Sequence, residues 1–261
     1  MAESAHVGYV QARLQALYGS RPAGDDWRLL ESSIDLQHYL DALRSTALKR
    51  WVRGISPDSS AIEIERTLRA NWRDAVRRLA GWAPSEWQEA VLWCQWLPEL
   101  PTLGHLLDGA SVQTWMRADP VASSYAMDSV ADVWIALENT ELAPMVASLR
   151  DAVGVQDAWR SVLASRVPDG ISVIAQKQFS ALLALLGEHI HAMQFADPDS
   201  DGQVLRAGLR DQLGSTFRRA SGTVVALFAY LGLQALECER VRAGLVTRRL
   251  LKRVPEGMTW V

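Results

Sequence analysis

The chain has 261 residues, of which 49% are hydrophobic and 22% charged, and its formal net charge is −3. This is the composition of a soluble globular protein, and the length suits one large domain or two smaller ones. The longest apolar runs, near 181–186 and 224–233, are too short to span a bilayer. The first residues lack the basic flank and apolar segment of a secretory signal. We therefore expect no direct membrane insertion.

Two further features concern the compartment and the partners. Cys94 and Cys238 lie in helical patterns, which favours free thiols in a reducing, cytoplasmic environment. Charge is unevenly distributed, because residues 98–201 carry 5 basic and 14 acidic side chains whereas residues 202–261 carry 10 and 4. The folded molecule should therefore have a dipolar surface that steers a partner. Neither block interleaves basic residues with aromatics, which argues against nucleic acid as a partner.

Helical periodicity runs through the first 110 residues. Ser60 and Glu63 have the spacing of a capping box and predict a strong helix start. Pro98 and Pro101 are expected to break the helix before them. Trp51 is not clearly placed on an apolar stripe and is a candidate exposed contact residue. The predicted helices cover about 6–18, 26–34, 36–43, 61–81, 84–97 and 103–107.

The rest of the chain also shows helical spacing, and no long stretch alternates with period two. The sequence therefore predicts an all-α fold. The expected helices are at about 111–117, 121–138, 141–152, 155–166, 173–195 and 204–219, followed by a closing pair at 223–233 and 234–251.

The closing segment carries a charged string inside its apolar pattern. Glu237 and Glu239 lie about 200° apart around a helix axis, so both cannot point straight into water. At least one should lie beside protein, with Arg240 or Arg242 as the nearby group that neutralises it. The alternative interpretation is an ordinary solvated charged face.

Four segments, taken in chain order, resemble a known family. They are Tyr9–Arg13, Leu43–Leu48, Ile64–Leu68 and Glu237–Arg242. The family is the central-stalk subunit of rotary ATPases, found in both the archaeal (A-type) and the vacuolar (V-type) enzymes. Its members open with Tyr-x-x-Ala-Arg, continue through Leu-x-x-Thr-x-Tyr and Ile-Glu-x-x-Leu, and close with Glu-x-Glu-x-x-Arg before a basic patch. The resemblance covers roughly residues 7–107 and 203–261.

The resemblance implies an array of helical bundles in which the N- and C-terminal helices pack together. We expect an N-terminal bundle at 1–110, a shortened acidic middle region at 111–202, and C-terminal helices at 203–261 that close onto the first bundle. Tyr9 and Leu245 should then be buried where the ends meet. The chain departs from the family at Leu48, where a tyrosine is expected, and at Thr102–Leu106, where the family has Asn-Leu-Lys. It is also shorter than a usual member, as if the middle bundle were missing or merged.

The implied function is that of a rotor subunit without chemistry of its own. Such a subunit seats on the membrane ring and holds the lower end of the rotating shaft during proton or sodium transport. Its partners are other rotary-ATPase subunits, and it is cytoplasmic and peripheral to the membrane through the complex. One alternative is a free-standing helical adaptor or regulatory protein that retains the fold but not the rotary partners. Another is a helical-bundle enzyme whose site the sequence does not reveal.

A partner surface of this kind should combine complementary charge with aromatic anchors. The acidic middle region and the basic end of the chain supply the candidates, although the acids could equally form only the solvated face of a helix. The candidate partner-binding residues are Trp115, Asp128, Asp132, Trp134, Glu138, Glu141, Arg248 and Arg249. Lys252 and Arg253 extend the basic patch.

Patterns typical of catalytic and metal sites are incomplete. The chain has no phosphate-binding loop and no Gly-x-Ser-x-Gly. Asp197–Gly202 imitates half of a calcium loop, but Gly208 stands where a glutamate is required. Glu188–His191 holds one Glu-x-x-His, whereas di-iron bundles use two. We therefore predict no catalytic residue, no metal, no cofactor and no small-molecule ligand.

Overall fold

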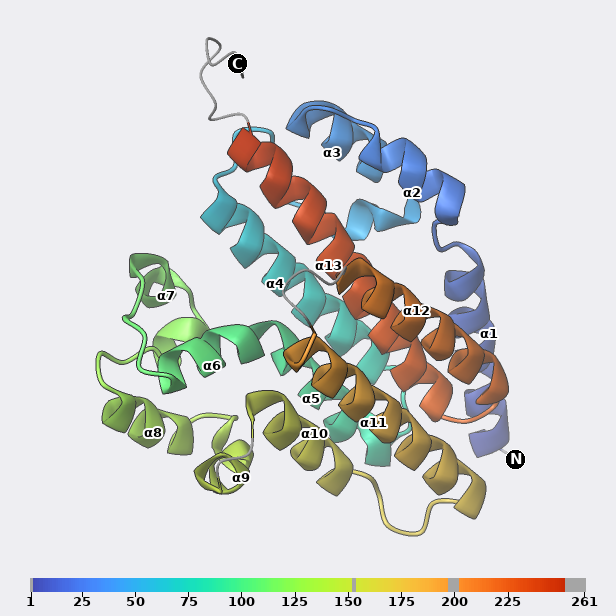
Figure 1. Ribbon diagram of the computed structural model, residues 1–261. Helices are drawn as coiled ribbons and strands as arrows, with labels where there is room; N and C mark the ends of the chain where they lie inside the picture. The colour runs from blue at the N-terminus through green and yellow to red at the C-terminus, as the bar shows by residue number, and fades with distance from the viewer. Residues whose placement is uncertain (1, 152–153, 197–201, 252–261) are drawn as a thin grey trace.

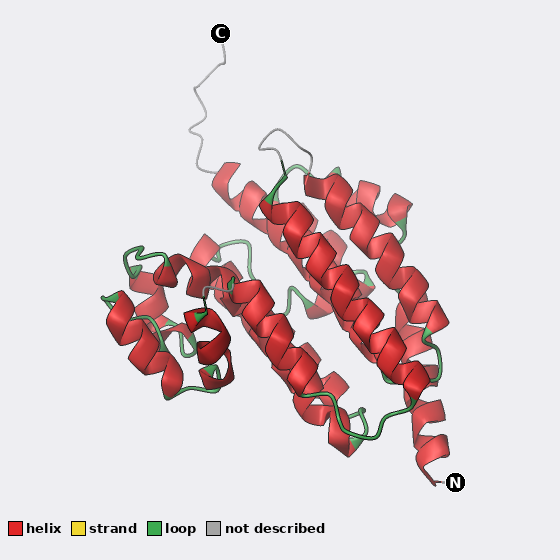
Figure 2. Ribbon diagram, turned by 60° about the horizontal axis from the view of Figure 1, so that its bottom comes forward, coloured by secondary structure: helices red, strands yellow, loops and turns green. Residues whose placement is uncertain are grey.

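The computed structural model describes residues 2–151, 154–196 and 202–251, and all regular elements in these ranges are helical (Figure 2). The predicted all-α class is therefore confirmed. The α-helices are α1 (Ala2–Gly19), α2 (Gly24–Glu31), α3 (Leu36–Arg44), α4 (Ala61–Ala80), α5 (Gln88–Trp93), α6 (Leu100–Leu107), α7 (Thr114–Ala118), α8 (Val130–Glu138), α9 (Val146–Arg150), α10 (Val155–Ser165), α11 (Val173–Gln194), α12 (Gly202–Arg219) and α13 (Val225–Leu251). Short 3-10 helices are η1 (Ala47–Arg50), η2 (Ser85–Trp87), η3 (Cys94–Glu99), η4 (Ala122–Ser124) and η5 (Ala143–Met145).

The best-specified helix start is that of α4. The Ser60 hydroxyl accepts a hydrogen bond from the Glu63 amide at 3.2 Å, and the Glu63 carboxylate accepts one from the Ser60 amide at 2.7 Å. This reciprocal pair satisfies two backbone donors that the first turn of a helix leaves free. The capping box predicted from the sequence is confirmed.

The closing helix α13 is the centre of the main bundle. It lies lengthwise between α4 and α12 and also contacts α1, α3 and α11 (Figure 1). Residues 225–231 are all buried, which gives this end of α13 contacts on every side. The sequence predicted two segments here, but α13 is a single helix of 27 residues. Gly222, with φ of 84°, forms the turn between α12 and α13.

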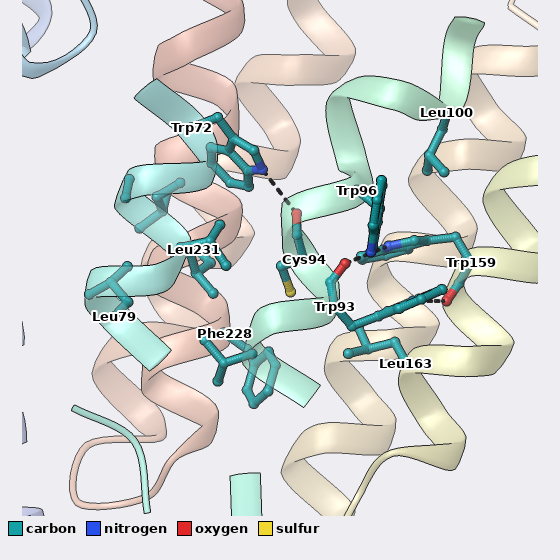
Figure 3. Close-up of a cluster of buried hydrophobic side chains, with 14 of the residues drawn as sticks. Trp72, Leu79, Trp93, Cys94, Trp96, Leu100, Trp159, Leu163, Phe228 and Leu231 are labelled. Carbon is teal, nitrogen blue, oxygen red and sulfur yellow. Dashed lines mark hydrogen bonds between the residues drawn. The ribbon is translucent and has the colours of Figure 1, made fainter. Parts of the chain in front are cut away.

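A lobe of short helices, α6 to α9, stands beside the main bundle (Figure 1). Next to the lobe, tryptophans link α5 to α10 and α4 to η3. The indole of Trp93 on α5 donates to the Trp159 carbonyl on α10 at 3.0 Å, and the indole of Trp159 donates to the Trp93 carbonyl at 3.3 Å (Figure 3). Trp72 on α4 donates to the Cys94 carbonyl at 2.9 Å. These indoles fill the core and also satisfy buried carbonyls, as buried tryptophans commonly do.

Three sequence predictions are wrong in their details. Pro98 lies inside η3 and Pro101 in the first turn of α6, so the helical path continues through both prolines instead of breaking. The helix predicted at 121–138 exists only as α8, because Ser129 caps its start and Tyr125 turns into the core. Trp51 is fully buried and stacks with Trp72 at 6.2 Å between ring centroids, so it is not an exposed contact residue.

Helix α1 packs near the start of α13 and against α12. Val10 and Leu14 of α1 are buried, and α1 contacts α13. Tyr18 stacks on Phe217 of α12 at 4.4 Å between ring centroids. Leu245 is fully buried, but Tyr9 is 57% exposed, so the predicted burial of Tyr9 is wrong. The helical face that contains Val10 and Leu14 makes the contact, and Tyr9 lies off that face.

Candidate partner-binding surfaces and two buried carboxylates

The acidic candidates lie on the surface of the lobe, and several are paired with basic neighbours. Asp128, in the loop before α8, pairs with Arg117. Glu138 at the end of α8 pairs with Arg150 at 2.5 Å, and Glu141 accepts a hydrogen bond from Gln95 at 3.3 Å. Exposed pairs of this kind contribute little to stability. These acids therefore remain available to a partner at small energetic cost.

The other candidates of the lobe have different settings. Asp132 is exposed in the first turn of α8 and accepts a hydrogen bond from the Ser129 hydroxyl at 2.7 Å. Trp134 is half-buried against the core. Trp115 on α7 is also half-buried, and the guanidinium of Arg69 lies 5.0 Å from its ring centroid. Trp115 thus helps to join the lobe to α4, whereas Asp132 faces solvent.

The basic candidates on α13 make contacts within the molecule. Arg248 donates to the backbone carbonyls of Ser33 and Glu31, each at 2.8 Å, and its guanidinium lies 4.0 Å from the ring centroid of Tyr39. It therefore holds the α2–α3 turn against α13. Arg249 is half-buried beside it. Lys252 and Arg253, and Asp197 to Asp201 of the incomplete calcium loop, lie outside the described residues.

Glu237 is the carboxylate of the charged string that lies beside protein. It is 4% exposed and accepts hydrogen bonds from Arg21 at 2.5 Å, Arg50 at 2.9 Å and Gln234 at 3.0 Å. We call Glu237, Arg21, Arg50 and Gln234 the Glu237 cluster. Arg21 donates to one carboxylate oxygen and Arg50 to the other, which compensates for the removal of the carboxylate from water. The prediction that one carboxylate is buried is confirmed.

The predicted partners of that carboxylate are wrong. Arg240 makes a bidentate pair with Glu31 at 2.6 and 2.7 Å. Arg242 pairs with Glu65 of α4 at 2.6 Å and with Glu239 at 3.2 Å. Arg242, five positions after Glu237, lies about 140° away around the helix axis and faces α4 instead. Arg240, three positions after Glu237, lies on a neighbouring side of the helix, but Glu31 holds its guanidinium.

A second buried carboxylate was not predicted. Glu99, with no exposed surface, accepts hydrogen bonds from Arg69 at 2.9 Å, Arg73 at 2.8 Å and the Tyr125 hydroxyl at 2.8 Å. Arg69 also donates to the Thr102 hydroxyl at 3.0 Å. We call these five residues the Glu99 cluster. It ties α4 to η3, α6 and the segment before α8.

Burial raises the pKa of two thiols and of a tyrosine hydroxyl in the described residues. Burial raises the pKa of both the Cys94 and the Cys238 thiols to about 12, so both are protonated and are weak nucleophiles. Burial, and then the Glu99 carboxylate, raise the pKa of Tyr125 well above its usual value, which keeps its hydroxyl a hydrogen-bond donor. Within the described ranges no group of three metal-ligating side chains is brought together.

Comparison with known proteins adds no relative: no family model matches the chain, and no curated protein matches its sequence. None of the helices in the described part of the chain combines the length and apolar character needed to cross a membrane.

Proposed function

We propose that the chain is a non-catalytic helical subunit that binds other proteins, similar to the central-stalk subunit of archaeal and vacuolar-type rotary ATPases. In this role it links the rotor shaft to the membrane ring and transmits torque in proton or sodium transport. It is not an enzyme, and its location is peripheral to the cytoplasmic membrane through the complex.

The observation that carries the proposal is the meeting of the segments on which the resemblance depends. Glu237 of the closing segment pairs with Arg50, two residues after the Leu43–Leu48 segment. Arg242 of the same segment pairs with Glu65 of the Ile64–Leu68 segment. The closing segment and the Ile64–Leu68 segment, about 180 residues apart, thus contact each other through charged positions, and the closing segment also pairs with Arg50 just beyond Leu43–Leu48. This contact supports the resemblance.

A second candidate is the free-standing adaptor. The observation that favours it is the small size of the lobe, in which α7 and α9 have only five residues each. A lobe of this size offers less surface than a full helical bundle. The adaptor would use the same acidic surface but would bind a partner outside any rotary ATPase.

Co-purification from the native host distinguishes the two candidates. The tagged chain is expressed at native level, membranes are solubilised in mild detergent, and the captured proteins are identified by mass spectrometry. The rotor-stalk proposal predicts capture of the membrane ring and the shaft subunits. Recovery of the chain without them, while the host's rotary ATPase remains assembled, would contradict the proposal.

The surface of the lobe is tested by reversing Asp128, Asp132 and Glu138 to lysine. We expect the helical fold to persist and partner capture to weaken most at low salt, where charge attraction is least screened. A matched control reverses the exposed acids Asp58, Glu86 and Asp211, which lie outside the lobe. Equal weakening by both triple variants would show that net charge, and not this surface, controls association.

A further inference from the structure

A cleft of about 190 Å³ opens beside the Glu237 cluster. It lies where the turn between α1 and α2 faces α12 and α13. Its walls are mostly arginine and apolar groups, and they include Arg21, Trp27, Arg210, Leu236, Glu237 and Arg240. These residues come from the α1–α2 turn, α2, α12 and α13, and the first two lie about 180 residues before the last two, so the cleft exists only in the folded chain.

The charges around this cleft do not cancel. Glu237 supplies one negative charge, which Arg21 and Arg50 share. Arg240 is neutralised by Glu31. Arg210 makes no hydrogen bond or ion pair with any other residue in ranges 2–151, 154–196 and 202–251. The cleft therefore has about two positive charges without a counter-charge on the protein.

The arginines also keep unused hydrogen-bond donors. Arg21 donates to Glu237 through Nε at 2.5 Å, and Arg240 donates to Glu31 through Nε and Nη2. Among the described residues, the Nη groups of Arg21 and Nη1 of Arg240 have no acceptor of their own. Trp27 is buried, and the Arg240 guanidinium lies 4.3 Å from its ring centroid. Stacking and the bidentate pair hold Arg240 in one orientation beside the cleft.

We propose that this cleft binds a small oxyanion with two negative charges, of the phosphate class. Two such charges balance the uncompensated charge of the site, and guanidinium groups match the geometry of oxyanions. The volume is below the roughly 300–1,000 Å³ of pockets that hold larger organic ligands, which favours a small anion over a nucleotide. The inference is independent of the rotor-stalk proposal, because it concerns the bundle face and not the lobe.

Inorganic phosphate is the probe that tests this site in the full-length protein. Isothermal titration calorimetry, with sodium chloride added to keep the ionic strength constant, should show saturable binding of one phosphate per chain. Arg210→Gln should weaken this binding about tenfold or more, since it removes charged hydrogen bonds to the anion. Its fold should persist, because Arg210 has no partner among the described residues, and an unchanged melting temperature without phosphate checks this.

The matched control is Arg219→Gln, which removes the same charge from an exposed position at the end of α12. It should bind phosphate as the wild type does. Absence of saturable binding to the wild type would overturn the proposal. An equal loss of affinity in the two variants would also overturn it, because binding would then depend on net charge and not on the cleft.

Discussion

The Glu99 and Glu237 clusters each stabilise a buried carboxylate, but they differ in how open they are to solvent. In both, a buried glutamate lies between two arginines. Glu99 has no exposed surface, and its arginine side chains are each 11% exposed. The arginines of Glu237 are 14% and 17% exposed, and one side of the cluster opens into the cleft. The first cluster is a closed structural contact, whereas the second leaves positive charge accessible to a ligand.

A buried ion pair is not by itself a functional site. The Glu99 carboxylate has acceptor sites occupied by two arginines and a tyrosine, and its surroundings are protein on every side. Nothing remains for a ligand to contact. Both clusters have two arginines for one carboxylate, but only at Glu237 does the excess positive charge border a cavity. Access to that charge distinguishes the two.

Glu99→Gln should have the largest effect on stability. The variant leaves Arg69 and Arg73 without a counter-charge in a closed environment, and breaking a buried pair costs about 3–5 kcal/mol. Urea unfolding, followed by circular dichroism, measures the free energy of unfolding. A loss below about 1 kcal/mol would mean that water reaches this cluster and that it is not closed.

Glu237→Gln should have a smaller effect. Arg21 and Arg50 can be solvated through the cleft once the carboxylate is gone, so the expected loss is that of charged hydrogen bonds, about 1.5–3 kcal/mol. The same urea experiment compares the two variants directly. If Glu237→Gln lowers the free energy of unfolding more than Glu99→Gln does, the assignment of the Glu237 cluster as the open one is wrong.

Two helical glycines differ in the space around them. A Cβ added at Gly244 of α13 would lie 2.6 Å from Cζ of Tyr39, whereas one added at Gly104 of α6 would meet a methyl group of Val155 at 3.8 Å. Gly244→Ala should therefore destabilise the protein by about 1–3 kcal/mol through overpacking. Gly104→Ala has room and should stabilise α6 by up to about 1 kcal/mol.

Thermal unfolding of these two alanine variants checks whether Gly244→Ala lowers the melting temperature and Gly104→Ala raises it. A stabilising Gly244→Ala would show that α3 can move away from α13 without loss. The contact between the N-terminal helices and the closing helix would then depend on the charged groups and not on close packing.

The sequence predicted those features that depend on neighbours along the chain. The capping box of α4 and the burial of one carboxylate in the charged string follow from helix geometry alone. The partners of Glu237 did not follow, because Arg21 and Arg50 are 216 and 187 residues away and meet it only through the packing of the bundle. Arg240 and Arg242 were predicted as the partners of Glu237 because they are its nearest basic residues in the sequence.

The Glu99 cluster was missed for a different reason. Glu99 lies between Pro98 and Pro101, where the prolines suggested a break and the helical periodicity is weak. Its partner Tyr125 lies in a segment that was predicted to be helical, but the chain turns inward there so that the tyrosine can reach Glu99. A buried hydrogen bond between distant segments outweighed local helical preference.

Phosphate rescue of the two glutamine variants tests the difference between the clusters most directly. Ligand binding to the folded state raises the free energy of unfolding. Phosphate at constant ionic strength should stabilise Glu237→Gln more than the wild type, because loss of the carboxylate makes the cleft more positive. It should stabilise Glu99→Gln no more than the wild type. Equal rescue of both variants, or no greater stabilisation of Glu237→Gln than of the wild type, would contradict the assignment of the Glu237 cluster as open and the Glu99 cluster as closed.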